Sequence, residues 1–146
     1  MHNALSAFYE RDIEKLIDEL NLFRDENNIW KIGGSVKNSS GNLVLHILGN
    51  LNHFIGATLA GTGYVRNRDH EFIQTGVERT ELIDRLEQTA TLVKETIEAL
   101  TPDQLEKEFP YEINQVKTST RNMLLHFLLH LNYHLGQVNY LRRIIE

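Results

Sequence analysis

Two long segments of this 146-residue chain contain no charged residue. Asn38 to Val65 and Asn122 to Leu141 each lack Asp, Glu, Lys and Arg. Their length raises the question of a membrane span, but Asn, Gln, Gly and His interrupt both, and neither holds a clean apolar run of spanning length. We therefore interpret both as buried helices of a bundle, with no membrane partner. Their broad apolar surface predicts that a second subunit covers part of it.

Apolar residues recur at helical spacing in four stretches of the chain. We expect helices over about Ala4–Arg24, from about Asn42 to the Gly61–Gly63 pair, over about Glu78–Leu100, and from Ser119-Thr120 to Arg143 or beyond. Asn42 is expected to cap the second helix, and Thr101-Pro102-Asp103 to end the third. The pattern predicts one all-α domain over residues 1–146, a four-helix bundle. Its connections of about fifteen residues exceed those of tight hairpins, so crossover-type connections are expected.

The charge balance and the lack of cysteine exclude several functions. The formal net charge is −5 and no cluster of Lys and Arg is present, which argues against a nucleic-acid partner. The absence of cysteine excludes disulfides, thiolate metal sites and a cysteine nucleophile. The N-terminal stretch MHNALSAFYERDIEK has no basic region followed by an apolar core, so a cytoplasmic location is expected.

Histidines recur within the two uncharged segments. His126, His130 and His134 are four residues apart and therefore share one face of a helix. Imidazole is the commonest metal ligand in proteins. All three rings would span about 12 Å of helical rise, too far for one ion bound at about 2 Å. Two ligands are thus expected from this helix, as either neighbouring pair, and the third from His46 or His53.

A lone histidine on an apolar helix is more often a packed core residue, but a shared metal explains why several imidazoles would be buried together. Asn50 lies one turn after His46 and is expected to contact a ligand or the substrate. The chain has no HExxH motif and no Glu-x-x-His pair, and Ile32–Ser35 lacks the lysine of a phosphate-binding loop. A cation held by three neutral nitrogens would keep its full charge, acidify a bound water or thiol and leave positions open for substrate.

Three stretches resemble the DinB/YfiT-like family, in particular a DinB-like subgroup of unknown function. HFLLHLNYHLGQVNYLRR resembles the family's last helix, NLVLHILGNLNHFIGATL its second helix, and TGYVRNRDHEF its RDxEF stretch. The resemblance implies a four-helix bundle with unusual connectivity, often a homodimer, and a three-histidine site for a divalent metal, zinc or nickel. The ligands implied are His46, His130 and His134, with His126 as a neighbour and His53 beside the site. Some relatives join a low-molecular-weight thiol to an electrophile, and others are suspected hydrolases.

Several further residues are candidates for the site. The charged stretch from Arg66 to Glu71 is expected to form either a buried clasp or a rim that faces the substrate. Glu71 is the best acidic candidate for a general base, and His53 is a second catalytic candidate. Gln137 is expected beside the ligands, and Gly136 is expected to allow the close approach of another helix.

The sequence therefore predicts a divalent-metal-dependent enzyme that activates an exogenous thiol or water toward a small-molecule substrate. The metal is expected to be Zn²⁺ or Ni²⁺, and the protein a homodimer. The alternative is a non-catalytic homodimeric bundle that binds a metal or another ligand.

Overall fold

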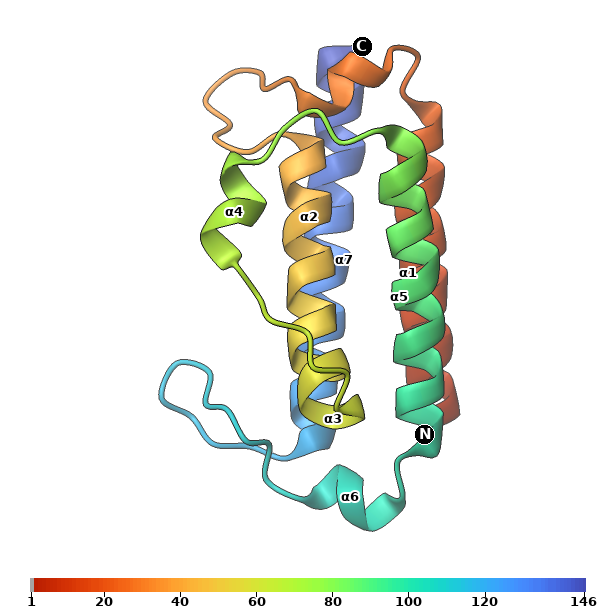
Figure 1. The fold of residues 1–146 in the computed structure, drawn as a ribbon, viewed down its shortest axis with the longest axis vertical. Coiled ribbons are helices and arrows are strands. Elements are labelled where there is room, and N and C mark those ends of the chain that lie inside the picture. The colour runs from red at the N-terminus through yellow and green to blue at the C-terminus, as the bar shows by residue number, and fades with distance from the viewer. Residues whose placement is uncertain (1) are drawn as a thin grey trace.

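Four long helices form a bundle within residues 2–146, the part of the chain that the computed structural model describes (Figure 1). Their bounds are α1 (His2–Leu22), α2 (Ser40–Leu51) with its continuation through the π-helical turn η2 (Asn52–Ala57) and α3 (Thr58–Ala60), α5 (Arg79–Ala99) and α7 (Thr120–Ile145). These bounds lie within a few residues of those predicted from the apolar spacing. The prediction of an all-α four-helix bundle is confirmed.

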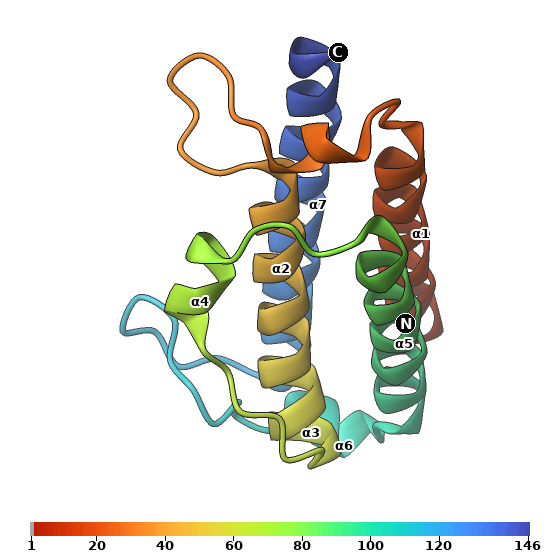
Figure 2. The same cartoon turned by 45° about the horizontal axis from the view of Figure 1, so that its top comes forward.

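The long helices do not simply alternate in direction. α1 runs antiparallel to α5 and α2 antiparallel to α7, whereas α2 and α5 run in the same direction (Figures 1 and 2). After α3 the chain must therefore return along the length of the bundle before α5 begins. Residues 61–78 make this return on the outer side of α2, which confirms the predicted crossover connection.

The connections contain three short helices that the apolar spacing did not predict: η1 (Glu26–Trp30), α4 (Arg68–Ile73) and α6 (Pro102–Glu106). The side chain of Asn67 caps α4 by accepting a hydrogen bond from the backbone N–H of His70. The predicted end of the third long helix is confirmed, because α5 stops at Ala99 and Pro102 begins α6, where its missing N–H costs nothing.

The first turn of α2 differs from the expectation that Asn42 is its cap. Ser39 is the cap, because its Oγ accepts a hydrogen bond from the backbone N–H of Asn42. Asn42 lies inside the helix, and its Nδ2 donates to the backbone oxygens of Glu71 at 3.0 Å and Gln74 at 2.8 Å. Asn42 therefore fastens α4 to α2 rather than capping α2.

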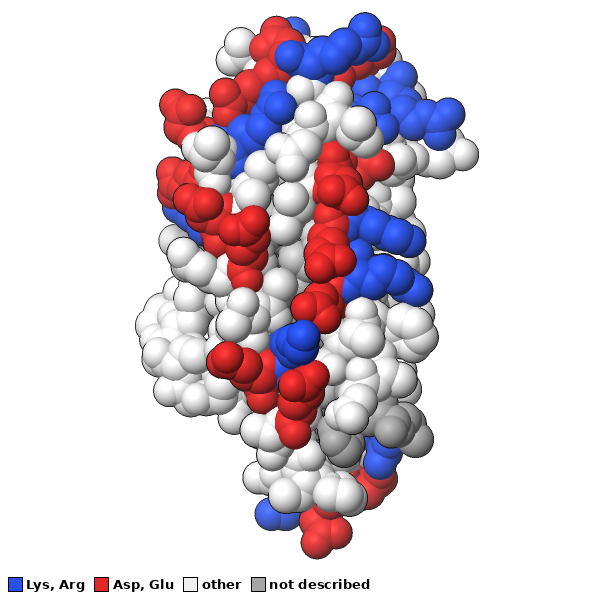
Figure 3. Space-filling model, turned by 90° about the vertical axis from the view of Figure 1, so that its right-hand side faces the viewer, with Lys and Arg blue, Asp and Glu red and all other residues white. Residues whose placement is uncertain are grey.

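Burial differs between the two sides of the bundle. Every residue of α2 is buried, as predicted for the first uncharged segment. Within the described residues, the continuous helix Ser40–Ala60 is long and apolar enough to cross a membrane, but 61% of its most apolar window is buried inside the fold. The side formed by α1 and α5 instead carries rows of Asp and Glu (Figure 3).

Candidate metal centre

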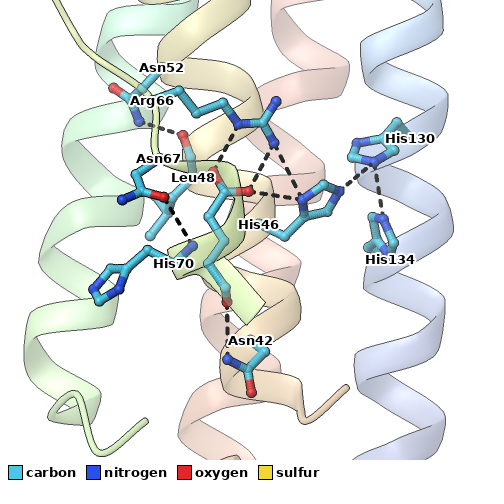
Figure 4. Close-up of polar contacts among 10 residues, drawn as sticks. Asn42, His46, Leu48, Asn52, Arg66, Asn67, His70, His130 and His134 are labelled. Atoms are coloured by element: carbon cyan, nitrogen blue, oxygen red, sulfur yellow. Dashed lines mark hydrogen bonds and ion pairs between the residues drawn. The ribbon is translucent and has the colours of Figure 1, made fainter. Parts of the chain in front are cut away.

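Three histidines from two helices meet between α2 and α7. The Nε2 atom of His130 lies 3.0 Å from Nε2 of His46 on α2 and 3.0 Å from Nε2 of His134, one turn further along α7 (Figure 4). One nitrogen of each ring lies within 4.8 Å of those of the other two. The antiparallel packing of α2 on α7 thus brings together residues that are 84 positions apart in the chain.

The outer nitrogens of two of these rings are held by acceptors. Nδ1 of His46 donates to Oε1 of Glu71 at 3.0 Å, and Nδ1 of His134 donates to Oε1 of Gln137 at 2.7 Å. These acceptors assign the Nδ1–H tautomer to both rings, so each Nε2 presents its lone pair to the shared space. Two nitrogens 3.0 Å apart can both lie at the usual Zn–N distance of about 2.0–2.1 Å from one ion. Imidazole nitrogen is a ligand that Zn²⁺ and Ni²⁺ both accept, so the chemistry of these three donors fits a divalent metal.

The surroundings also favour the neutral form of His130 and His134, which metal binding requires. Burial, followed by the neighbouring charges of His134 and His46, lowers the pKa of His130 to about 3. Burial also lowers the pKa of His134, against an opposing effect of its hydrogen bond to Gln137. His130 therefore stays unprotonated throughout the physiological pH range.

Glu71 and Arg66 form a clasp behind His46. Nε of Arg66 donates to Oε2 of Glu71 at 2.8 Å and its Nη2 donates to Oε1 at 2.9 Å (Figure 4). Glu71 is only 6% exposed. Burial alone would raise its pKa, but the hydrogen bonds from His46 and Arg66 outweigh burial and the pKa is lowered. The carboxylate thus stays ionised and contacts the side of His46 that faces away from His130.

Gly49 makes room for this clasp. A Cβ atom built at Gly49 would lie 1.8 Å from Oε2 of Glu71, a separation that no real pair of atoms adopts. The carboxylate therefore packs directly on the backbone of α2, one turn after His46. Sequence reasoning missed this role, although a glycine inside an apolar helical segment is the usual signal of close approach.

Other candidate residues lie around the three histidines. His126 is exposed, with its ring 5.8 Å from that of Phe127, and it is outside the cluster of nitrogens. His53 is half-buried against the rings of Phe54 and Tyr111, and burial, together with Arg66, lowers its pKa. Its proposed catalytic role stays a prediction.

Asn50 is buried one turn after His46, as its spacing predicted. It is 8% exposed, and its Oδ1 has no hydrogen-bond partner among residues 2–146. Of the charged stretch, Arg66 and Glu71 form the clasp, whereas Arg68 and Asp69 are exposed to solvent.

Comparison with known proteins agrees with this fold. The family described as "Protein of unknown function (DUF1572)" matches residues 3–146. The crystal structure of a DinB-like protein, YjoA of Bacillus subtilis, is similar with a TM-score of 0.69 and 20% sequence identity, covering 97% of this chain and 91% of that one. No curated protein matches the chain. The chain therefore belongs to the DUF1572 family and has the fold of a DinB-like protein, which confirms the resemblance seen in the sequence.

Proposed function

We propose that this protein is a divalent-metal-dependent enzyme that activates an exogenous thiol or water. His46, His130 and His134 would hold the metal, with Zn²⁺ or Ni²⁺ as the expected ion. The observation that carries the proposal is the convergence of three Nε2 atoms, two of them on rings whose Nδ1 atoms are fixed by Glu71 and Gln137. The Nδ1 contacts leave the Nε2 lone pairs of His46 and His134 directed at Nε2 of His130, an arrangement that a shared metal explains.

The charges of the site favour a reactive cation. Imidazole ligands bring no negative charge to a metal, and the carboxylate of Glu71 beside them is paired with Arg66. When bound, a divalent cation lowers the pKa of a thiol or water that coordinates it. The chain has no cysteine, so any reacting sulfur arrives with a substrate.

The structure favours a positioning role for Glu71 over that of a general base. Both of its oxygens accept hydrogen bonds from the clasp, and its lowered pKa makes it a weak base. A carboxylate behind a histidine ligand fixes the tautomer and orientation of the ring. His53 remains the candidate for proton exchange with the substrate.

The first experiment measures metal binding by protein purified without a histidine tag. Elemental analysis and calorimetric titration with Zn²⁺ and Ni²⁺ should give one equivalent per chain, and His130→Ala should abolish binding. His126→Ala is the matched control on the same helix and should bind nearly normally. Less than about a tenth of an equivalent in the wild type, not restored by added metal, would reject the metal site. Equal loss in both variants would reject the choice of ligands.

The second experiment tests the reaction. Low-molecular-weight thiols are incubated with a generic electrophile, and simple esters with water, using metal-loaded and metal-free protein. Product that needs both the metal and His130 supports the proposal. A protein that binds the metal tightly but gives no metal-dependent product with any thiol or ester is instead a non-catalytic metal-binding bundle.

A further inference from the structure

A small cavity lies between the last turns of α7, the start of α2 and the loop before α2, and Gln137 connects it to the metal centre. It has a volume of about 340 Å³, which lies within the range of small-molecule sites. Its walls come from α7, from Leu43 at the start of α2 and from the loop that precedes α2. Gln137, whose Oε1 holds Nδ1 of His134, is part of the wall. Leu43 lies one turn before His46 on α2. The cavity and the histidine cluster therefore share both of their supporting helices.

The lining of the cavity is mostly apolar and partly exposed. Val36, Tyr140 and Ile144 meet there, although each exposes at least 41% of its surface. Exposed apolar side chains that gather around one hollow indicate a binding surface rather than ordinary surface scatter. The loop reaches this position through a turn in which Gly34 adopts a positive φ of 59° and the N–H of Val36 donates to the oxygen of Gly33.

One positively charged side chain lines this apolar cavity. Lys37 is the single charged residue of its lining, and no carboxylate among residues 2–146 forms an ion pair with it. The larger groove between α1 and α5 has the opposite character. It has a volume of about 790 Å³, is lined by several carboxylates, and its Lys94 is paired with Glu10. A negatively charged apolar molecule therefore has one matching site among these two.

We propose that this cavity binds the substrate, and that the substrate has an apolar body and a carboxylate end that pairs with Lys37. This inference rests on the proposed function, because it names the substrate class of the same centre. The apolar body would pack on Val36, Tyr140 and Ile144. Its contact with Gln137 would link occupancy of the cavity to the orientation of His134.

Octanoate is the probe, and binding is followed by ¹H–¹⁵N NMR titration of the metal-free protein. We expect saturable shifts in residues 36–38 and in the side-chain amide of Gln137. Octylammonium, with the same chain and the opposite charge, should bind more weakly. Lys37→Glu should weaken octanoate binding by about fivefold or more, while Lys31→Glu, an exposed lysine outside the cavity, should change it less than about twofold.

Three results would overturn the inference: no saturable shifts, equal binding of octylammonium, or equal loss in the two lysine variants. The titration is then repeated with Co²⁺-loaded protein, in which octanoate should change the visible absorption of the metal. Failure to load Co²⁺ counts against the proposed function alone, because the cavity is tested first without metal. Binding without a change in the Co²⁺ spectrum would disprove the link through Gln137.

Discussion

Two helical segments lack charged residues for different reasons: the whole of α2, and residues 122–141 of α7. α2 is buried on every side, because α5 and α7 pack on its inner faces and α4 packs on its outer face. α7 buries one face and leaves the other open. Leu129 is 68% exposed and Tyr133 is 65% exposed, and Leu125 and Gly136 are exposed beside them. These four residues are called here the outer face of α7.

The difference shows that lack of charge has two meanings in this chain. In α2 the lack of charge reflects burial within one subunit. On the outer face of α7 the lack of charge is not explained by burial among the described residues. Two glycines make the same contrast, because Gly49 is crowded by Glu71 whereas nothing lies within 4 Å of a Cβ at Gly136. The expectation that Gly136 admits another helix is therefore wrong within the described chain.

The largest effect is expected from Gly49→Ala. Its methyl group would displace the carboxylate of Glu71 and separate it from Arg66. Breaking a buried ion pair costs about 3–5 kcal/mol, so we expect the free energy of unfolding in urea to fall by an amount of that order. The control is Gly136→Ala, measured in dilute protein, which should raise the free energy of unfolding by about 1 kcal/mol. Equal effects of the two substitutions would contradict the contrast between the helices.

The next largest effects are expected from the two residues that hydrogen-bond to ligands, Glu71 at His46 and Gln137 at His134. Glu71→Gln should weaken metal binding by about 10–100-fold, because the residues that orient a ligand contribute about that much. Gln137→Ala should weaken it less, since Gln137 is exposed and water can replace its oxygen as the acceptor for His134. Isothermal titration with Zn²⁺ measures both variants. A larger loss from Gln137→Ala would mean that α7, not the clasp on α2, controls the geometry of the site.

A third prediction tests the outer face of α7 directly. We expect two copies of the chain to pair through it, and Leu129→Glu should weaken the dimer by about tenfold or more, as charge does in an apolar interface. Gln88→Glu, at an exposed position of α5, is the matched control. Analytical ultracentrifugation over a range of concentrations measures both. If the wild type stays monomeric at every concentration, the prediction that a second subunit covers the outer face of α7 is wrong.

The sequence predicted the elements of this fold better than the supports of the site. Apolar spacing reports a buried stripe, so each long helix was visible, and the resemblance selected His46, His130 and His134, which the structure brings together. α4 is too short to show a period, and the contact of Glu71 with Gly49 exists only after the chain returns along α2. The sequence therefore predicts Glu71 as a candidate base or as part of a buried clasp, and its contact with His46 is visible only in three dimensions.

The last prediction concerns the pH dependence of metal-free protein. The pKa of His130 is lowered to about 3 in the fold, mainly by burial, whereas an unfolded histidine has a pKa of about 6.5. Between these pH values the unfolded chain binds a proton at this histidine that the folded chain does not bind. The free energy of unfolding therefore falls as the pH falls from about 6.5 toward 3. His130→Gln removes this dependence, while the carboxylates titrate in both proteins. Urea unfolding from about pH 7 to about pH 4.5 should therefore show that the wild type loses stability faster than the variant as the pH falls. If the stability of the two proteins changes with pH in parallel, His130 is as well hydrated as the outer face of α7. The contrast between the inner and outer faces of this helix would then be wrong.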